Sequence, residues 1–156
     1  MRKWAILLVL VTFLLAGCGP TVTPSAQKCA TILCCQGCAA ISVTRVIDGD
    51  TFDSSGGRVR LFGADTPERG ERCFSEATQR LRDLAGNTVR VEPGPRTKAR
   101  YGRLLYYAYT ESGESVEETL IREGLARAWT RDGQHRDMPV CVEESARRNR
   151  TGCLWR

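Results

Sequence analysis

Short stretches in which apolar and polar residues alternate recur along the chain from residue 42 onwards. Alternation with a period of two places one face of a strand against a core and the other face toward solvent. The pattern predicts five strands, at residues 42–46, 51–53, 58–62, 88–92 and 104–110. Serines and glycines between the second and third strands predict a hairpin, and Pro93 is expected to end the fourth.

Apolar residues spaced three and four apart predict three helices between and after these strands. The predicted helices cover residues 77–85, the stretch from residue 116 to Gly124, and residues 140–150. Gly86 is typical of a helix end, and Ser115 stands at capping-box distance from Glu118. Five short strands interleaved with three helices predict a small α+β domain that is dominated by a β-barrel.

The first residues have the pattern of an export signal. A basic pair at residues 2–3 precedes an apolar run at residues 4–15 that is short for a transmembrane helix. The run leads into Leu-Ala-Gly-Cys ending at Cys18, which resembles a bacterial lipobox and implies cleavage before Cys18 and lipid on that cysteine. A plain secretory signal and a short membrane anchor are the alternatives. The lipobox resemblance implies an extracytoplasmic, membrane-anchored protein, and Gly19 in place of Asp after the cysteine favours the outer membrane where the host has one.

We therefore divide the chain into three parts. Residues 1–17 are the signal, residues 18–40 are the lipidated cysteine with a flexible, Cys-rich tether, and residues 41–156 are the globular domain. The globular part has the length of one domain and is large enough for a core of its own. The formal charge of +5 includes two residues of the signal, and it is compatible with a nucleic-acid partner without specifying one.

Eight cysteines are many for 156 residues. Disulfides persist outside the cytoplasm, and lipid on Cys18 leaves an odd number, so at least one cysteine is free or intermolecular. A cluster near the start comprises Cys29, Cys34, Cys35 and Cys38. It is interpreted as a local disulfide knot or a loosely ordered segment, with a soft-metal site as the alternative. Cys73 is expected to pair with either Cys141 or Cys153.

One short segment carries several carboxylates and an arginine between turn residues. It contains Asp-Gly-Asp-Thr at residues 48–51, then Arg60, then Asp-Thr-Pro-Glu at residues 65–68. Hard divalent cations prefer carboxylate oxygens, and phosphate favours the planar guanidinium fork. Activation of water needs a further carboxylate that is not used as a ligand. The segment predicts phosphodiester hydrolysis with a divalent metal.

The order of motifs resembles the staphylococcal nuclease (thermonuclease) family. The matching motifs are Val-Ile-Asp-Gly-Asp-Thr at residues 46–51, Val-Arg-Leu at residues 59–61, Asp-Thr-Pro-Glu at residues 65–68, and Tyr-Gly-Arg at residues 101–103. Each is weak alone, but four in order are specific, and the resemblance covers about residues 41–155. It implies a five-stranded OB-fold barrel with three helices, which agrees with the elements predicted above.

The resemblance also implies roles for individual residues. Asp50 and Asp65 match the carboxylates that hold Ca²⁺, and the carbonyl oxygen of Thr66 completes the protein's direct ligands. Glu68 matches the general base that takes a proton from the attacking water.

Basic residues complete the implied site. Arg60 and Arg103 match the two arginines that hold the scissile phosphate and stabilise charge on its equatorial oxygens. Arg100 and Tyr101 match positions that contact a substrate phosphate, with a solvated basic turn as the alternative.

The implied function is that of a calcium-dependent endonuclease. It would hydrolyse DNA and RNA, single-stranded or frayed, to 5′-hydroxyl and 3′-phosphate products. The alternative is a non-catalytic OB-fold module that binds nucleic acid or acts as a surface interaction protein. The complete set of acids and arginines favours the enzyme, since a binding module has no need of a general base. No protein partner is predicted, and the chain is expected to be monomeric.

Several positions depart from the family pattern or lie outside the implied chemistry. Ala99 stands where the family has an acidic residue, and Thr130 stands where it has a base-stacking tyrosine. Trp129 is the neighbour of Thr130 and is expected to face the opposite side. Asp48 is expected to stabilise a turn, and His135 is expected to be exposed in a polar loop.

Overall fold

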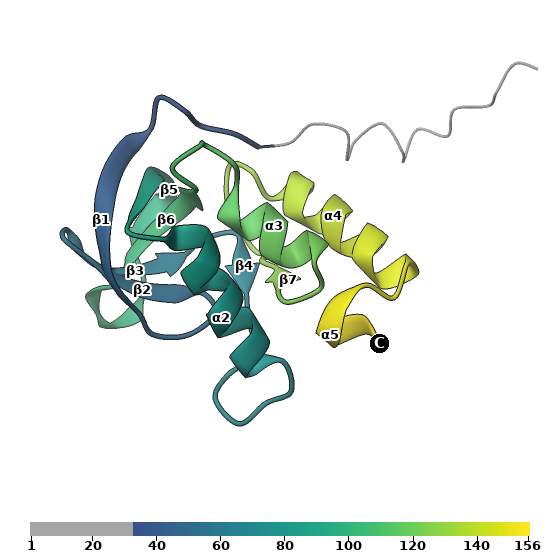
Figure 1. Ribbon diagram of the computed structural model, residues 1–156. Helices are drawn as coiled ribbons and strands as arrows, with labels where there is room; N and C mark the ends of the chain where they lie inside the picture. Colours follow the sequence, from purple (N-terminus) through teal and green to yellow (C-terminus); the bar gives the residue numbers. More distant parts are fainter. Residues whose placement is uncertain (1–32) are drawn as a thin grey trace, which may run out of the picture.

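A closed five-stranded β-barrel forms one half of the molecule in the computed structural model, which describes residues 33–156 (Figure 1). Its strands are β1 (Ala39–Val46), β2 (Thr51–Ser54), β3 (Gly57–Leu61), β5 (Thr88–Lys98) and β6 (Leu104–Tyr109). Around the barrel the order is β1-β2-β3-β6-β5, and pairing of β1 with β5 closes it. All neighbours are antiparallel except β3 and β6, which are parallel. The predicted α+β barrel is confirmed.

One strand boundary was predicted wrongly. We expected the strand at residues 88–92 to end at Pro93, but β5 continues to Lys98. The pairing of β5 with β6 shifts register between Pro93 and Lys98. An irregularity there accommodates a residue that has no N–H to donate to the ladder.

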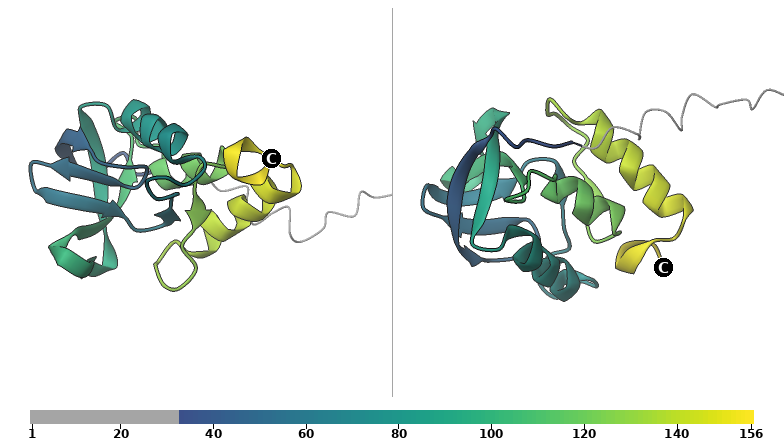
Figure 2. Two further views of the ribbon diagram at one scale, coloured as in Figure 1. Left: turned by 90° about the horizontal axis from the view of Figure 1, so that it is seen from below. Right: turned by 45° about the horizontal axis from the view of Figure 1, so that its top comes forward.

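The three predicted helices are present, and one further helical turn follows them. They are α2 (Phe74–Ala85), α3 (Val116–Arg122), α4 (Asp137–Arg148) and the short α5 (Gly152–Trp155). Figure 2 shows α3, α4 and α5 grouped on one side of the barrel. The hydroxyl oxygen of Ser115 accepts the Glu118 N–H at 3.1 Å, which confirms the predicted cap of α3. Gly86, with φ 52°, ends α2 as predicted.

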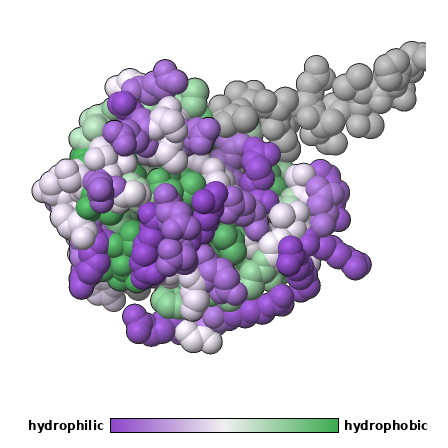
Figure 3. Space-filling model, viewed as in Figure 1, coloured by the Kyte–Doolittle hydropathy of each residue, from purple (hydrophilic) through white to green (hydrophobic). Residues whose placement is uncertain are grey.

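The core lies between the barrel and the helices. Phe52 and Val59 of the barrel are fully buried together with Leu81 of α2 and Leu120 of α3. In Figure 3 hydrophilic side chains cover the outward face of α2 at the centre of the view. Within residues 33–156, no helix is long and apolar enough to cross a membrane. Cys18 and Cys29 lie outside the described residues.

Two disulfides join pairs of cysteines that both lie within residues 33–156. Cys35 pairs with Cys38, and Cys73 pairs with Cys153, which settles the choice that the sequence left open. Cys141 is also disulfide-bonded, whereas Cys34 is an exposed free thiol. The Cys35–Cys38 bond removes both sulfurs as thiolate ligands and favours the local disulfide over the soft-metal interpretation.

Glu117 is a buried acid at the start of α3. It is 1 % exposed, and the Ala108 N–H of β6 donates to its two carboxylate oxygens at 3.1 and 3.2 Å. Burial raises the pKa of Glu117 from its ordinary 4.5 to about 8, although backbone N–H donors and the charge of Arg60 oppose the shift. The folded protein therefore keeps a proton on this carboxyl through neutral pH.

This proton makes stability depend on pH. The unfolded carboxyl ionises near 4.5 and the folded one near 8, so folding takes up a proton between these values. The contribution of Glu117 is fully present below pH 4.5 and is lost as pH rises through 8. We expect Glu117→Gln to be more stable than the wild type at pH 9, because the wild type must then bury an ionised carboxylate. One pKa unit corresponds to about 1.4 kcal/mol and the shift exceeds one unit, so the difference should be at least of this size. The difference should shrink at pH 5.

Urea denaturation at pH 5 and pH 9 provides the measurement, with the exposed Glu144→Gln as the control. A Glu117→Gln variant whose stability relative to the wild type is the same at both pH values would contradict the assignment.

Candidate functional site

Arg60 joins three segments of the chain at one end of the barrel. It lies on β3, and its side chain is only 14 % exposed. Its Nε lies 3.0 Å from Oδ1 of Asp50, and one terminal nitrogen donates to Oδ1 of Asp65 at 2.7 Å. The other terminal nitrogen donates to the carbonyl oxygens of Leu61 at 2.7 Å and Ala64 at 2.6 Å. The two acids predicted as metal ligands and the arginine predicted to bind phosphate are therefore together.

Asp50 is the buried member of this group. It is 6 % exposed, and its Oδ2 accepts the N–H of Thr66 at 2.9 Å and the Thr66 hydroxyl at 3.0 Å. The turn before it is held by Asp48, whose Oδ1 accepts the Asp50 N–H at 3.1 Å, as predicted. Burial and the charge of Asp50 raise the pKa of Asp48. A Cβ at Gly49 would lie 2.7 Å from Oγ1 of Thr66, so only glycine permits this close approach.

The donor set of this group suits a hard cation. Asp65 belongs to β4 (Ala64–Asp65), which pairs with β7 (Arg127–Ala128), and its side chain is 54 % exposed. Contact with the same guanidinium brings the carboxylates of Asp50 and Asp65 close to each other. Among residues 33–156 no group of three or more His, Cys, Asp and Glu side chains is placed to hold a metal. A cation here therefore needs a backbone oxygen such as that of Thr66, or oxygens from a ligand.

Arg103 reaches the same end of the barrel from a distant part of the chain. It follows η1 (Arg100–Gly102), and the Ala99 N–H donates to its carbonyl oxygen at 2.8 Å to close the turn. Tyr101 occupies the left-handed region with φ 63° and is 92 % exposed. Nε of Arg103 is buried and has no hydrogen-bond partner. The side chain of Arg100 lies outside what the structure describes.

Arg60 and Arg103 line one cavity of about 540 Å³. We call it the arginine cavity; its lining is Arg60, Leu61, Phe62, Arg96, Ala99, Arg103, Leu105, Trp129, Arg131 and Asp132. Asp132 is the one acid in this lining, and it is engaged by Arg96 at 3.1 Å and by Nε1 of Trp129 at 2.7 Å. The charge of the cavity is thus strongly positive and its walls are partly aromatic. Because Ala99 replaces an acid, it adds no negative charge beside Arg103.

Trp129 and Thr130, which follow β7, line different hollows, and the tryptophan is the one that lines the arginine cavity. Thr130 lines a separate surface hollow with Glu143 and Arg147. The guanidinium of Arg131 lies 5.1 Å from the centre of the Trp129 ring. The expectation that these two residues face opposite sides is confirmed.

His135 is not freely exposed, contrary to our expectation. Its side chain is 25 % exposed, and Nε2 lies 2.9 Å from Oε2 of Glu92 on β5. Burial opposes the charge of Glu92, but hydrogen bonds from Gln134, His135 and Tyr109 outweigh it and lower the pKa of Glu92. This cluster attaches the loop after Trp129 to the barrel. It therefore fixes one wall of the arginine cavity.

Glu68 lies on the other side of the Arg60–Asp65 ion pair. It is exposed in a second hollow, which we call the acidic hollow. The lining of that hollow is Asp65, Thr66, Pro67, Glu68, Glu71, Arg72, Cys73, Arg127 and Leu154. Arg60 borders the first hollow and Asp65 the second, so their ion pair stands between them. The candidate phosphate-binding arginines and the candidate base therefore lie on the two sides of one contact.

Some residues of these two hollows were missed in the sequence. They are Arg96, Arg131 and Glu71. The sequence at residues 129–132 contains three residues that line the arginine cavity. The direction in which their side chains point depends on the loop that His135 attaches to the barrel. Nothing local distinguishes Glu71 from other exposed acids.

Comparison with known proteins identifies relatives of this chain. The family model described as "Staphylococcal nuclease homologue" matches residues 58–156. An "Uncharacterized endonuclease" of Escherichia coli is 34 % identical over 118 residues, covering 72 % of this chain and 74 % of that protein. A "Micrococcal nuclease" of Shigella flexneri is 37 % identical over 128 residues, covering 72 % and 71 %. A "Thermonuclease" of Staphylococcus hyicus is 39 % identical over 99 residues, covering 55 % and 57 %.

The contacts of the two acids with Arg60 predict unequal effects on stability. Asp50→Ala removes a buried carboxylate and leaves Arg60 and Thr66 without it, so we expect the free energy of unfolding to fall by about 3 kcal/mol or more. Asp65→Ala removes a half-exposed partner and should cost about 1 kcal/mol or less. Urea denaturation without added metal measures both. Equal losses in the two variants would show that Asp50 is not the buried anchor.

Proposed function

Because the chain belongs to the staphylococcal nuclease homologue family, we propose that it is a calcium-dependent nuclease acting on single-stranded or frayed DNA and RNA. The observation that carries the proposal is the buried, unpartnered Nε of Arg103 in the cavity that Arg60 also lines. A buried guanidinium N–H without an acceptor is costly, and a phosphate oxygen is a suitable acceptor. The cavity is thus prepared for an anionic ligand of this class.

The scissile phosphate would lie between Arg60 and Arg103. Arg103 offers a free buried donor, and the guanidinium of Arg60 is fixed by its four acceptors. Two positioned guanidinium groups stabilise charge that grows on the equatorial oxygens as phosphorus becomes five-coordinate. Arg100 and Tyr101 belong to η1, directly before Arg103, and are proposed to contact the next phosphate of the nucleic-acid strand.

Trp129 would supply a surface for a nucleobase. It lines the arginine cavity with Phe62, and stacking of a base on an aromatic ring contributes about 1–3 kcal/mol regardless of base identity. Arg131 beside the ring adds positive charge near the backbone of the strand. This arrangement favours strands whose bases are unpaired.

Asp50, Asp65 and the carbonyl of Thr66 would hold Ca²⁺. The ion, when bound, neutralises negative charge on the phosphate and polarises its oxygens. The chain's own contribution is to keep the two carboxylates in place, which the hydrogen bonds of Arg60 and Thr66 achieve. Oxygen ligands of this kind suit calcium.

Glu68 would act as the general base from the acidic hollow. Its carboxylate takes a proton from the water that attacks phosphorus, and the bond from phosphorus to the 5′ oxygen breaks. The products are a 3′-phosphate and a 5′-hydroxyl. Placement on the far side of the Arg60–Asp65 contact from the arginine cavity suits attack opposite the leaving oxygen.

We also propose an extracytoplasmic location with lipid on Cys18. The Cys35–Cys38 and Cys73–Cys153 disulfides support an oxidising compartment. The lipobox-like tetrapeptide ending at Cys18 supports a membrane anchor.

Calcium dependence is tested with Asp65→Asn, because Asp65 is half exposed and its loss should not unfold the protein. We expect cleavage of denatured DNA by the wild type to require calcium and to stop with chelator. Calorimetry should show calcium affinity reduced roughly tenfold or more in Asp65→Asn, since a ligand charge is lost. The exposed Asp137→Asn is the control and should bind as the wild type does. Binding of denatured DNA without any cleavage would instead favour the non-catalytic OB-fold module.

Glu68→Gln tests the general base. Loss of a positioned base typically slows the reaction by about 10²–10⁴-fold. We expect kcat to fall in this range while calcium binding, followed by calorimetry, stays within error. The exposed Glu111→Gln serves as the matched control. Wild-type turnover in Glu68→Gln would remove Glu68 from the mechanism.

A further inference from the structure

Glu68 lies in a turn that is closed from both directions by Glu71. The Glu71 N–H donates to the carbonyl oxygen of Glu68 at 2.9 Å, and the Glu68 N–H donates to Oε2 of Glu71 at 2.8 Å. Both side chains are exposed, so no core packing fixes this turn. The position of Glu68 therefore depends on what holds the turn where it joins α2.

The turn is joined to α2 through Cys73. The Phe74 N–H donates to the carbonyl oxygen of Glu71 at 3.4 Å, and Cys73 precedes it as the buried N-cap residue of α2. Cys73 has a left-handed backbone with φ 75°, and its side chain makes no capping hydrogen bond. Its sulfur is bonded instead to Cys153, 80 positions further along the chain.

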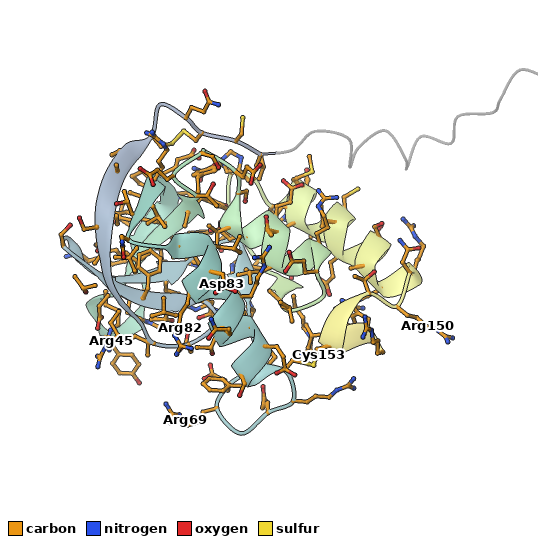
Figure 4. The ribbon with its side chains drawn as sticks, viewed as in Figure 1. Arg45, Arg69, Arg82, Asp83, Arg150 and Cys153 are labelled. Atoms are coloured by element: carbon orange, nitrogen blue, oxygen red, sulfur yellow. A yellow bond between two sulfur atoms is a disulfide. The ribbon has the colours of Figure 1, made fainter. Side chains whose placement is uncertain are left out.

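The segment that carries Cys153 is itself firmly seated. A Cβ at Gly152 would lie 1.8 Å from the carbonyl oxygen of Glu123, and one at Gly124 would lie 2.0 Å from the carbonyl oxygen of Thr151. Two glycines thus allow backbone contact, which the Leu154 N–H strengthens by donating to the Gly124 carbonyl oxygen at 3.0 Å. Figure 4 shows Cys153 beside the base of α2, whereas Arg69 projects from the loop away from it.

The same segment forms a wall of the acidic hollow. Leu154 lines that hollow together with Glu68 and Cys73. Arg72, next to Cys73, donates to the carbonyl oxygen of Arg156 at 3.1 Å. Residues 152–156 are therefore joined to the segment between Glu68 and α2 by a disulfide and a hydrogen bond, and Leu154 lines the same hollow as Glu68.

We infer that Cys73 and Cys153 are positioning residues for Glu68, and that the oxidation state of their disulfide sets the rate of cleavage. This inference rests on the proposed function, since it concerns the base of that reaction. Misplacing a catalytic group by about 1 Å costs up to ~10²-fold in rate. A dithiol would open the bond by thiol–disulfide exchange. The dithiol is oxidised to a disulfide, and its two electrons and two protons reduce Cys73 and Cys153 to thiols.

The experiment compares Cys73→Ser/Cys153→Ser with Cys35→Ser/Cys38→Ser. The second variant removes the Cys35–Cys38 disulfide, which does not line the acidic hollow. Full-length proteins are assayed on denatured DNA with calcium, well below the melting temperature of each. We expect kcat of the first variant to fall by roughly 10- to 100-fold, with KM and calcium affinity changed less than about twofold. The second variant should keep the wild-type kcat. Dithiothreitol should slow the wild type and the second variant but not the first.

If the Cys73–Cys153 disulfide only stabilised the fold, its removal would lower the melting temperature without lowering kcat selectively over KM. A folded first variant with wild-type kcat would overturn the inference and leave the proposed function intact. A wild type that cleaves nothing would refute the proposed function itself. Should the first variant not fold, graded reduction of the wild type followed by alkylation and mass spectrometry decides. Activity must then track alkylation of Cys73 and Cys153, and activity that tracks Cys35 and Cys38 refutes the inference.

Discussion

The contacts of the largely buried Arg60 side chain are those on which both the fold at this end of the barrel and the site depend. Removing such a charge from water is costly, and here the cost is offset by two carboxylates and two carbonyl oxygens. The acceptors come from the turn just before β2, from the end of β3 and from β4. A single side chain therefore fixes the register of three segments and the spacing of the two acids. Stability and chemistry at this end of the barrel are one network.

The two hollows beside Arg60 differ in charge. Four arginines and one acid line the arginine cavity, whereas three acids and two arginines line the acidic hollow. Burial raises the pKa of Glu117 to about 8, so this carboxyl adds no full negative charge near Arg60 at neutral pH. The positive potential of the arginine cavity is thereby preserved for an anionic strand.

Local sequence determined more of this structure than distant contacts did. The cap at Ser115, the end of α2 at Gly86 and the turn of Asp48 depend on residues within four positions, and all three were predictable. The motif order also placed Arg103 beside Arg60 across more than forty positions. The facing of Trp129 and the burial of His135 were not predictable, because Glu92 and Arg96 of β5 hold that loop through His135 and Asp132. The choice of Cys153 over Cys141 likewise depends on where α5 is seated, and a single turn of helix leaves almost no periodic signal.

The backbone contact between Gly124 and Gly152 has a consequence for the order in which the molecule is made. A chain emerging from a ribosome or a translocation channel presents the barrel strands and α3 first, and the segment at residues 152–156 only after them. Until that segment reaches Gly124, the hollow beside Glu68 lacks a wall and Cys73 lacks its partner. Completion of the site therefore requires both the arrival of residues 152–156 and the oxidation of Cys73 with Cys153.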